Sequence, residues 1–235
     1  MLTFSDRQFD TFRDGARRTW VAAEAPRLHA TFAQHYTAHG TTPDTLVPVI
    51  QAVAAWAQSY GIRAQADVTR LSIIAASLGH RFWEDPRTAP MLATVLADTL
   101  PRSRSALTLT AEVKHWLGAL WQGDDLAGFA ARLGTAIRAG DPLETDTLRM
   151  ILPGHWHILS AFDNDRLQQW LVACLPPDIA RREGHALATV ACALVHGTNW
   201  LADPQYPRLS ALVRADSTPG ALADGLNALY AEVCA

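Results

Sequence analysis

Two histidines stand two positions apart in the stretch "PGHWHILSAFDND", a spacing that suits metal chemistry. In an extended segment, His155 and His157 would point to the same side and chelate an ion, with Asp163 and Asp165 close by. In a helix the two imidazoles would point about 200° apart and would not share an ion. No HExxH motif and no third ligand at a diagnostic spacing accompanies them. We interpret them as turn or surface histidines, and keep a metal- or ligand-binding helical enzyme as an alternative.

The other reactive residue types form no recognisable catalytic motif. Cys192 and His196 are four apart on one expected helix face, so they could approach a common ligand. The chain contains no GxSxG elbow, no GxxxxGK[ST] loop and no GxGxxG loop. Paired acids at 124–125 and 144–146 fall where helix starts favour negative charge. We therefore predict a protein that is not an enzyme, with no catalytic residue, no metal site and no cofactor.

Arginines and large aromatic residues are the candidates for contact with another protein. Three arginines cluster on the first expected helix, where they form either a solvated face or a docking patch for an acidic partner. Tryptophan and tyrosine are enriched at interface centres. The predicted partner-binding residues are Arg13, Arg17, Arg18, Trp83, Trp200 and Tyr206.

Composition excludes several classes of partner. The net charge of -3 at pH 7 and the pI near 6.3 give no bulk attraction for nucleic acid or an anionic membrane. The three cysteines form no CxxC pair, which indicates free thiols in a reducing compartment. The charged N-terminus predicts no secretory signal, and no apolar run has the length of a membrane span. We expect a cytoplasmic protein without nucleic-acid or membrane partners.

Helical periodicity extends over nearly the whole chain. Thr42 suits an N-cap with Pro43 in the first turn, and Gly61 suits the end of that helix. Pro26 is expected to kink or restart the first helix. The only strand-like fragment is "ALTLT" at 106–110, so the next helix is expected to start with "TAEVKHWLGALW". The fold class predicted is all-α, with about ten helices in a bundle.

The stretches "LGHRFWEDP" and "VHGTNWLADP" repeat one pattern in the two halves of the chain. A shift of 118 positions pairs Gly79 with Gly197 and Asp85 with Asp203, and gives eight identities in the 23 positions 79–101. We predict two tandem copies of one helical module packed as one body; chance similarity of Ala- and Leu-rich helices is the alternative. The predicted modules are residues 1–104 and 105–235.

Chain geometry accounts for the residue types of this repeated corner. A glycine after an apolar run ends a helix, and the bulky residues that follow would pack over the helix end. Asp-Pro then starts the next segment, with aspartate as the cap. We therefore interpret the corner as structural and not as an active site.

Short motifs in both halves resemble a known group of proteins. The first half has Tyr60-Gly61-Ile62 followed by Asp67, and the second half has Asp203-Pro204 followed by Tyr206-Pro207. This pattern resembles small helical proteins encoded in bacterial type VI secretion effector clusters, beside spike proteins and adaptor-chaperones. The first half lacks the Tyr-Pro pair, and the second half lacks Tyr-Gly-Ile.

The resemblance implies a role in protein–protein contact. Such a protein would help to hold or load an effector, acting as an adaptor or chaperone. The alternative is an immunity protein that masks a cognate toxin. In either case the partner would be an effector, toxin or adaptor protein encoded nearby, and the group offers no catalytic residues to carry over.

Overall fold

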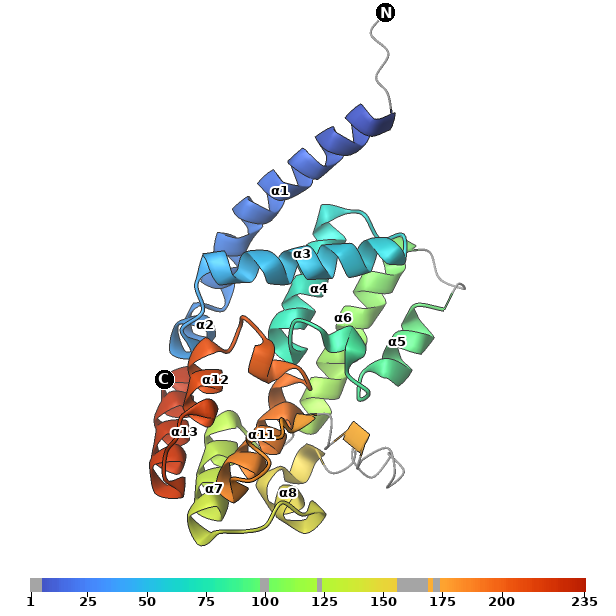
Figure 1. Cartoon of the computed structure of the whole chain (residues 1–235). Coiled ribbons are helices and arrows are strands. Elements are labelled where there is room, and N and C mark those ends of the chain that lie inside the picture. Colours follow the sequence, from blue (N-terminus) through green and yellow to red (C-terminus); the bar gives the residue numbers. More distant parts are fainter. Residues whose placement is uncertain (1–5, 98–101, 122–123, 156–168, 171–173) are drawn as a thin grey trace, which may run out of the picture.

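The computed structural model describes residues 6–97, 102–121, 124–155, 169–170 and 174–235. Within these residues all regular structure is helical, with eleven α-helices, three short 3-10 helices and no strand (Figure 1). The all-α prediction is therefore confirmed.

The first half of the chain builds one apolar core. Its buried residues extend from Val21 to Val113 and come from the helices α1 to α6, from η1 and from the turn after α3. Helix α6 packs on α4 and α5, whereas the sequence boundary at 104/105 assigns it to the second module. The elements are α1 (Asp6–Thr31), α2 (Ala33–His39), α3 (Pro43–Ser59), α4 (Gln65–Leu78), η1 (Phe82–Glu84), α5 (Ala89–Val95) and α6 (Arg102–Leu120).

The second half builds a separate core, with buried residues from Phe129 to Tyr230. Helix α13 packs along α7, and α11 lies against both. Helix α2 of the first half packs against α12 and α13, so the halves share an extensive junction (Figure 1). The elements are α7 (Leu126–Ala139), α8 (Thr145–Ile151), η2 (Pro153–His155), α11 (Glu183–His196), η3 (Trp200–Ala202), α12 (Pro207–Arg214) and α13 (Pro219–Cys234).

Helix α1 runs out from the body of the molecule, so that its N-terminal end lies far from the other helices (Figure 1). The expected restart at Pro26 is wrong, since α1 continues to Thr31. Val21, Ala25 and Leu28 are buried against the body on both sides of the proline, and this packing maintains the helix.

Helix α6 also differs from expectation, because it begins at Arg102 and includes the strand-like fragment. Ala106 and Leu109 of that fragment are buried on the face toward the first core. The Thr110 hydroxyl donates to the Ala106 carbonyl one turn earlier, at 2.8 Å. Burial of one helical face therefore outweighs the weak helix propensity of the two threonines.

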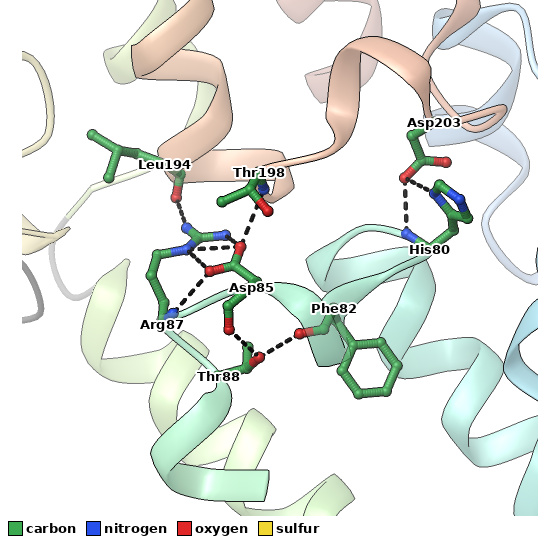
Figure 2. A network of polar contacts seen from close by, with 8 residues as sticks. All are labelled: His80, Phe82, Asp85, Arg87, Thr88, Leu194, Thr198 and Asp203. Carbon is green, nitrogen blue, oxygen red and sulfur yellow. Dashed lines mark hydrogen bonds and ion pairs between the residues drawn. The ribbon is translucent and has the colours of Figure 1, made fainter. Parts of the chain in front are cut away.

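The two repeated corners bond to each other (Figure 2). The backbone N–H of Thr198 donates to Oδ2 of Asp85 at 3.2 Å, and that of His80 donates to Oδ2 of Asp203 at 2.8 Å. Oδ1 of each aspartate accepts the N–H two residues further on, at 2.9 Å in both corners.

The helix cap expected at these aspartates is wrong, because the N-cap positions of α5 and α12 are Thr88 and Tyr206. Each aspartate instead closes its own turn and joins the opposite half. Asp85 and Asp203 thus make equivalent hydrogen bonds in the two corners. Duplication of the whole module stays a prediction.

Arg87 lies buried at the centre of this junction. Its guanidinium donates to both carboxylate oxygens of Asp85 and to the Leu194 carbonyl of the other half (Figure 2). In the second corner Gln205 takes the equivalent place, donating to Oδ2 of Asp203 at 3.2 Å and to the Ala75 carbonyl at 2.9 Å. The two corners therefore join the halves of the chain through buried hydrogen bonds and a buried ion pair.

Candidate functional site

A groove lies where α1 crosses α3 and the start of α4. Its volume is about 190 Å³. The buried residues Ala54, Ile62 and Val68 give it an apolar base, and the half-buried Trp20 lines it from α1. The groove therefore offers an apolar and aromatic surface at the root of the projecting helix.

The turn between α3 and α4 shapes this groove. Gly61 adopts φ +75°, which ends the helix as the sequence predicts. The Ile62 N–H then donates to the Ala57 carbonyl at 3.0 Å, and the Ile62 side chain is buried while Arg63 follows at the surface. The Tyr60-Gly61-Ile62 turn therefore shapes the groove.

The rim of the groove is basic. Arg17 from α1 and Arg63 from the turn both line it, and none of the described lining residues is acidic. Arg17 donates to Oε1 of Gln58 at 2.5 Å, which ties α1 to α3 across the groove. Two guanidinium groups beside an apolar base suit a ligand that combines carboxylates with an apolar side chain.

The structure places the three arginines of the predicted patch along α1. Arg17 lines the groove, and Arg18 is exposed beside it. Arg13 is on the same helix nearer its N-terminus, and its side chain lies outside the described residues. Sequence reasoning missed Gln58 and Arg63; the position of Arg63 directly after the Tyr-Gly-Ile motif was the only signal for it.

The three aromatic candidates lie in different surroundings. Trp83 is half-buried and stacks on Trp56, with ring centroids 5.1 Å apart. Trp200 and Tyr206 are fully buried in the second core. Their assignment as partner contacts is corrected: the indole N–H of Trp200 donates to the Thr189 carbonyl, and neither residue offers a surface to a partner.

Of the pair His155 and His157, only His155 lies within the described residues. His155 is a turn residue, as one of the two expectations had it, because it lies in the three-residue η2. It is not a surface residue, since it is buried with its ring 5.0 Å from that of Trp121. Burial, together with the positive charge of Arg87, lowers the pKa of His155 to about 3. His157, Asp163 and Asp165 lie outside the described residues. Within the described part of the chain, no three His, Cys, Asp or Glu residues are placed to hold a metal ion.

Cys192 and His196 do approach one common group, which is the hydroxyl of Tyr230. The hydroxyl lies 2.7 Å from Nε2 of His196 and 3.7 Å from Sγ of Cys192. Burial raises the pKa of the Cys192 thiol to about 12, so it is protonated and unreactive at neutral pH. The contact is part of the core and not a nucleophile pair.

A cluster of histidines is buried where α2 meets the second half. His35 and His39 are one turn apart on α2, with ring centroids 4.6 Å apart, and His39 lies 5.6 Å from the ring of His196. Among the described residues, Nε2 of His35 and both ring nitrogens of His39 have no hydrogen-bond partner. Sequence reasoning missed the pair on α2, although its four-residue spacing was visible.

Burial keeps these imidazoles neutral at pH 7. It lowers the pKa of His35 to about 4, partly offset by the negative charge of Asp203. It lowers the pKa of His39 to about 3, with further lowering by the nearby His35 and Arg208. The pKa of His196 is also lowered by burial, and its neighbours His39, His35 and Arg87 add to the effect.

Acid is expected to destabilise the fold through this cluster. Above pH 6.5 the histidines are neutral in both states and add no pH dependence. Below pH 6.5 these histidines become protonated in the unfolded chain but stay neutral in the folded chain. The free energy of unfolding therefore falls by up to about 1.4 kcal/mol per pH unit for each histidine. The three histidines of the cluster, His35, His39 and His196, together predict a loss of about 3–4 kcal/mol between pH 7 and pH 5.5. Urea unfolding across this range measures the loss.

The variant His39→Leu tests the source of that dependence, and we expect it to remove about a third of the loss, or about 1 kcal/mol. His115, which is exposed on α6, provides the matched control, since His115→Leu should leave the pH dependence unchanged. An unchanged pH dependence in His39→Leu would contradict the assignment.

Comparison with protein-family models, curated proteins and solved structures gives no match. No helix in the described residues combines the length and the apolar character needed to cross a membrane. A function for this chain is therefore inferred from its own residues, and above all from the basic groove.

Proposed function

We propose that this chain is a non-enzymatic binding protein of a type VI secretion effector system, which holds or loads an effector by capturing an acidic segment of a partner protein. The observation that carries the proposal is the groove between α1, α3 and α4, which joins a basic rim to an apolar base. The Tyr60-Gly61-Ile62 turn supports it, because the motif on which the resemblance to the type VI group rests shapes this groove.

The groove chemistry specifies the partner segment. Trp20 and the apolar base accept one large apolar side chain, since a volume of about 190 Å³ has no room for a folded element. The guanidinium groups of Arg17 and Arg63 can each donate bidentate hydrogen bonds to a carboxylate that flanks this side chain. We expect a segment with one large apolar residue flanked by Asp or Glu, bound faster at low salt.

Reversing the rim charge is expected to weaken partner binding. A pull-down with the products of neighbouring genes identifies the partner, and calorimetry then measures its affinity. The double variant Arg17→Glu/Arg63→Glu should lower that affinity at least about tenfold, because like charges then face the acidic segment. The variant Trp20→Ala should lower it about thirtyfold by removing a central aromatic contact.

The control Arg104→Glu/Lys114→Glu makes the same charge change at two exposed residues of α6, away from the groove. It should bind as the unmodified chain does, and circular dichroism checks that each variant is folded. Equal affinity of the groove variant and the control would overturn the docking site. Recovery of a toxin that the chain inactivates would replace the loading role by immunity, and recovery of no effector, adaptor or toxin would overturn both roles.

A further inference from the structure

A second pocket opens at the junction of the two halves, away from the basic groove. Its volume is about 200 Å³, and its lining comes from α2, α4, α7 and α11 and from residues beside α2, α6 and α12. Five of its lining side chains are flat rings, namely Phe32, His35, Trp121, His196 and Tyr206. Flat rings favour a flat ligand, which stacks on one ring and meets the edge of another.

None of the described residues that line this pocket is charged. The remaining lining residues are small or aliphatic, apart from the hydroxyl of Ser77, which donates to the Ile73 carbonyl at 3.2 Å. A charged ligand would lose its hydration here without gaining a counter-charge. The pocket therefore selects an uncharged molecule, in contrast to the groove with its two arginines.

His35 brings hydrogen-bonding capacity to the pocket that the described part of the chain does not use. Among the residues that the structure describes, Nε2 of His35 is buried without a hydrogen-bond partner. The ring of the fully buried His39 lies 4.6 Å from that of His35, and neither of its nitrogens has a partner within the same residues. His196 contacts the Tyr230 hydroxyl through Nε2 at 2.7 Å, and its ring lines the pocket beside His35. Because buried polar groups are ordinarily hydrogen-bonded, unpartnered imidazoles beside a pocket indicate a missing donor or acceptor.

We propose that this pocket binds a small, uncharged, flat molecule with at least one N–H or O–H group, of the phenol or indole class, against the imidazoles of His35 and His196. The ligand ring packs among the aromatic side chains, and its polar hydrogen is donated to a neutral imidazole nitrogen. This site is independent of the partner-binding groove, and neither depends on the other.

Titration of the full chain with phenol and with indole tests the proposal. Ligand-observed NMR and calorimetry at pH 7.5 should give saturable binding with a Kd below about 1 mM for at least one of them. The charged analogues benzoate and benzylammonium should bind at least about tenfold more weakly. Equal binding of a charged analogue, or no saturable binding of either neutral probe up to about 10 mM, would overturn the proposal.

Variants locate the bound probe. His35→Phe keeps a flat ring but removes the nitrogens, so probe affinity should fall at least about tenfold. Ser77→Phe fills the pocket from α4 and should abolish binding, which keeps the test open if His35→Phe does not fold. The control His115→Phe, on the exposed face of α6, should bind as the unmodified chain does. Unchanged affinity in a folded His35→Phe or Ser77→Phe would place the probe elsewhere and overturn the assignment.

Discussion

Replacing Arg87 by methionine is expected to lower the free energy of unfolding by about 3–5 kcal/mol. Arg87 and Asp85 are both buried, and the guanidinium pairs with the two carboxylate oxygens. Methionine keeps much of the side-chain length but leaves Asp85 as an uncompensated buried charge. It also removes the donor to the Leu194 carbonyl, which belongs to the other half. Urea unfolding followed by circular dichroism at pH 7 measures the loss.

Two further variants separate the cost of the uncompensated buried charge from the general cost of replacing an arginine by methionine. Arg138→Met removes an ion pair with the exposed Asp224 and should cost at most about 1 kcal/mol. The double variant Asp85→Asn/Arg87→Met removes both buried charges, so it should be more stable than Arg87→Met alone. If Arg87→Met costs no more than Arg138→Met, the central ion pair does not hold the halves together.

Helices whose ends depend on neighbouring residues could be predicted from the sequence. Thr42 caps α3 with its hydroxyl bonded to the Thr45 N–H, Pro43 occupies the first turn, and Gly61 follows the end, all as expected. The errors arose where distant packing decides. Pro26 lies within a helix that the body holds on both sides, and 106–110 is helical because one face is buried in the first core.

The candidate site could be predicted only in part for the same reason. The arginines of α1 stand together in the sequence, so Arg17 was visible. Gln58 and Arg63 join it only because α1 crosses α3, some forty residues further along the chain. Burial of an aromatic residue likewise depends on the facing element, which is why Trp200 and Tyr206 could not be recognised as core residues.

Replacing Gly79 by alanine is expected to lower the free energy of unfolding by about 4 kcal/mol. Gly79 adopts φ +95° and ψ 151°, a region that is essentially restricted to glycine. A Cβ there would lie 2.5 Å from the carbonyl oxygen of His196, a backbone atom that cannot rotate away. Gly197→Ala should behave alike, since φ is +97° and its Cβ would meet the Leu78 carbonyl. Urea unfolding gives both values.

Gly140→Ala separates backbone strain from steric overlap. Gly140 has φ +72° at the end of α7, and a Cβ there has no heavy atom within 4 Å. Only the left-handed backbone penalty of about 1 kcal/mol is then expected. A loss of the same size in Gly79→Ala would show that the close contact between the corners contributes nothing to stability.

Substituting both corner glycines tests whether the corners act as a pair. Each new Cβ meets the carbonyl of the residue directly before the opposite glycine, so either substitution pushes the same two backbones apart. Once the first substitution has separated them, the second meets less resistance. The variant Gly79→Ala/Gly197→Ala should therefore lose at least about 1 kcal/mol less than the sum of the single losses. Losses that add to within about 0.5 kcal/mol would mean that the two corners are independent and that the reciprocal bonds of Asp85 and Asp203 do not couple them.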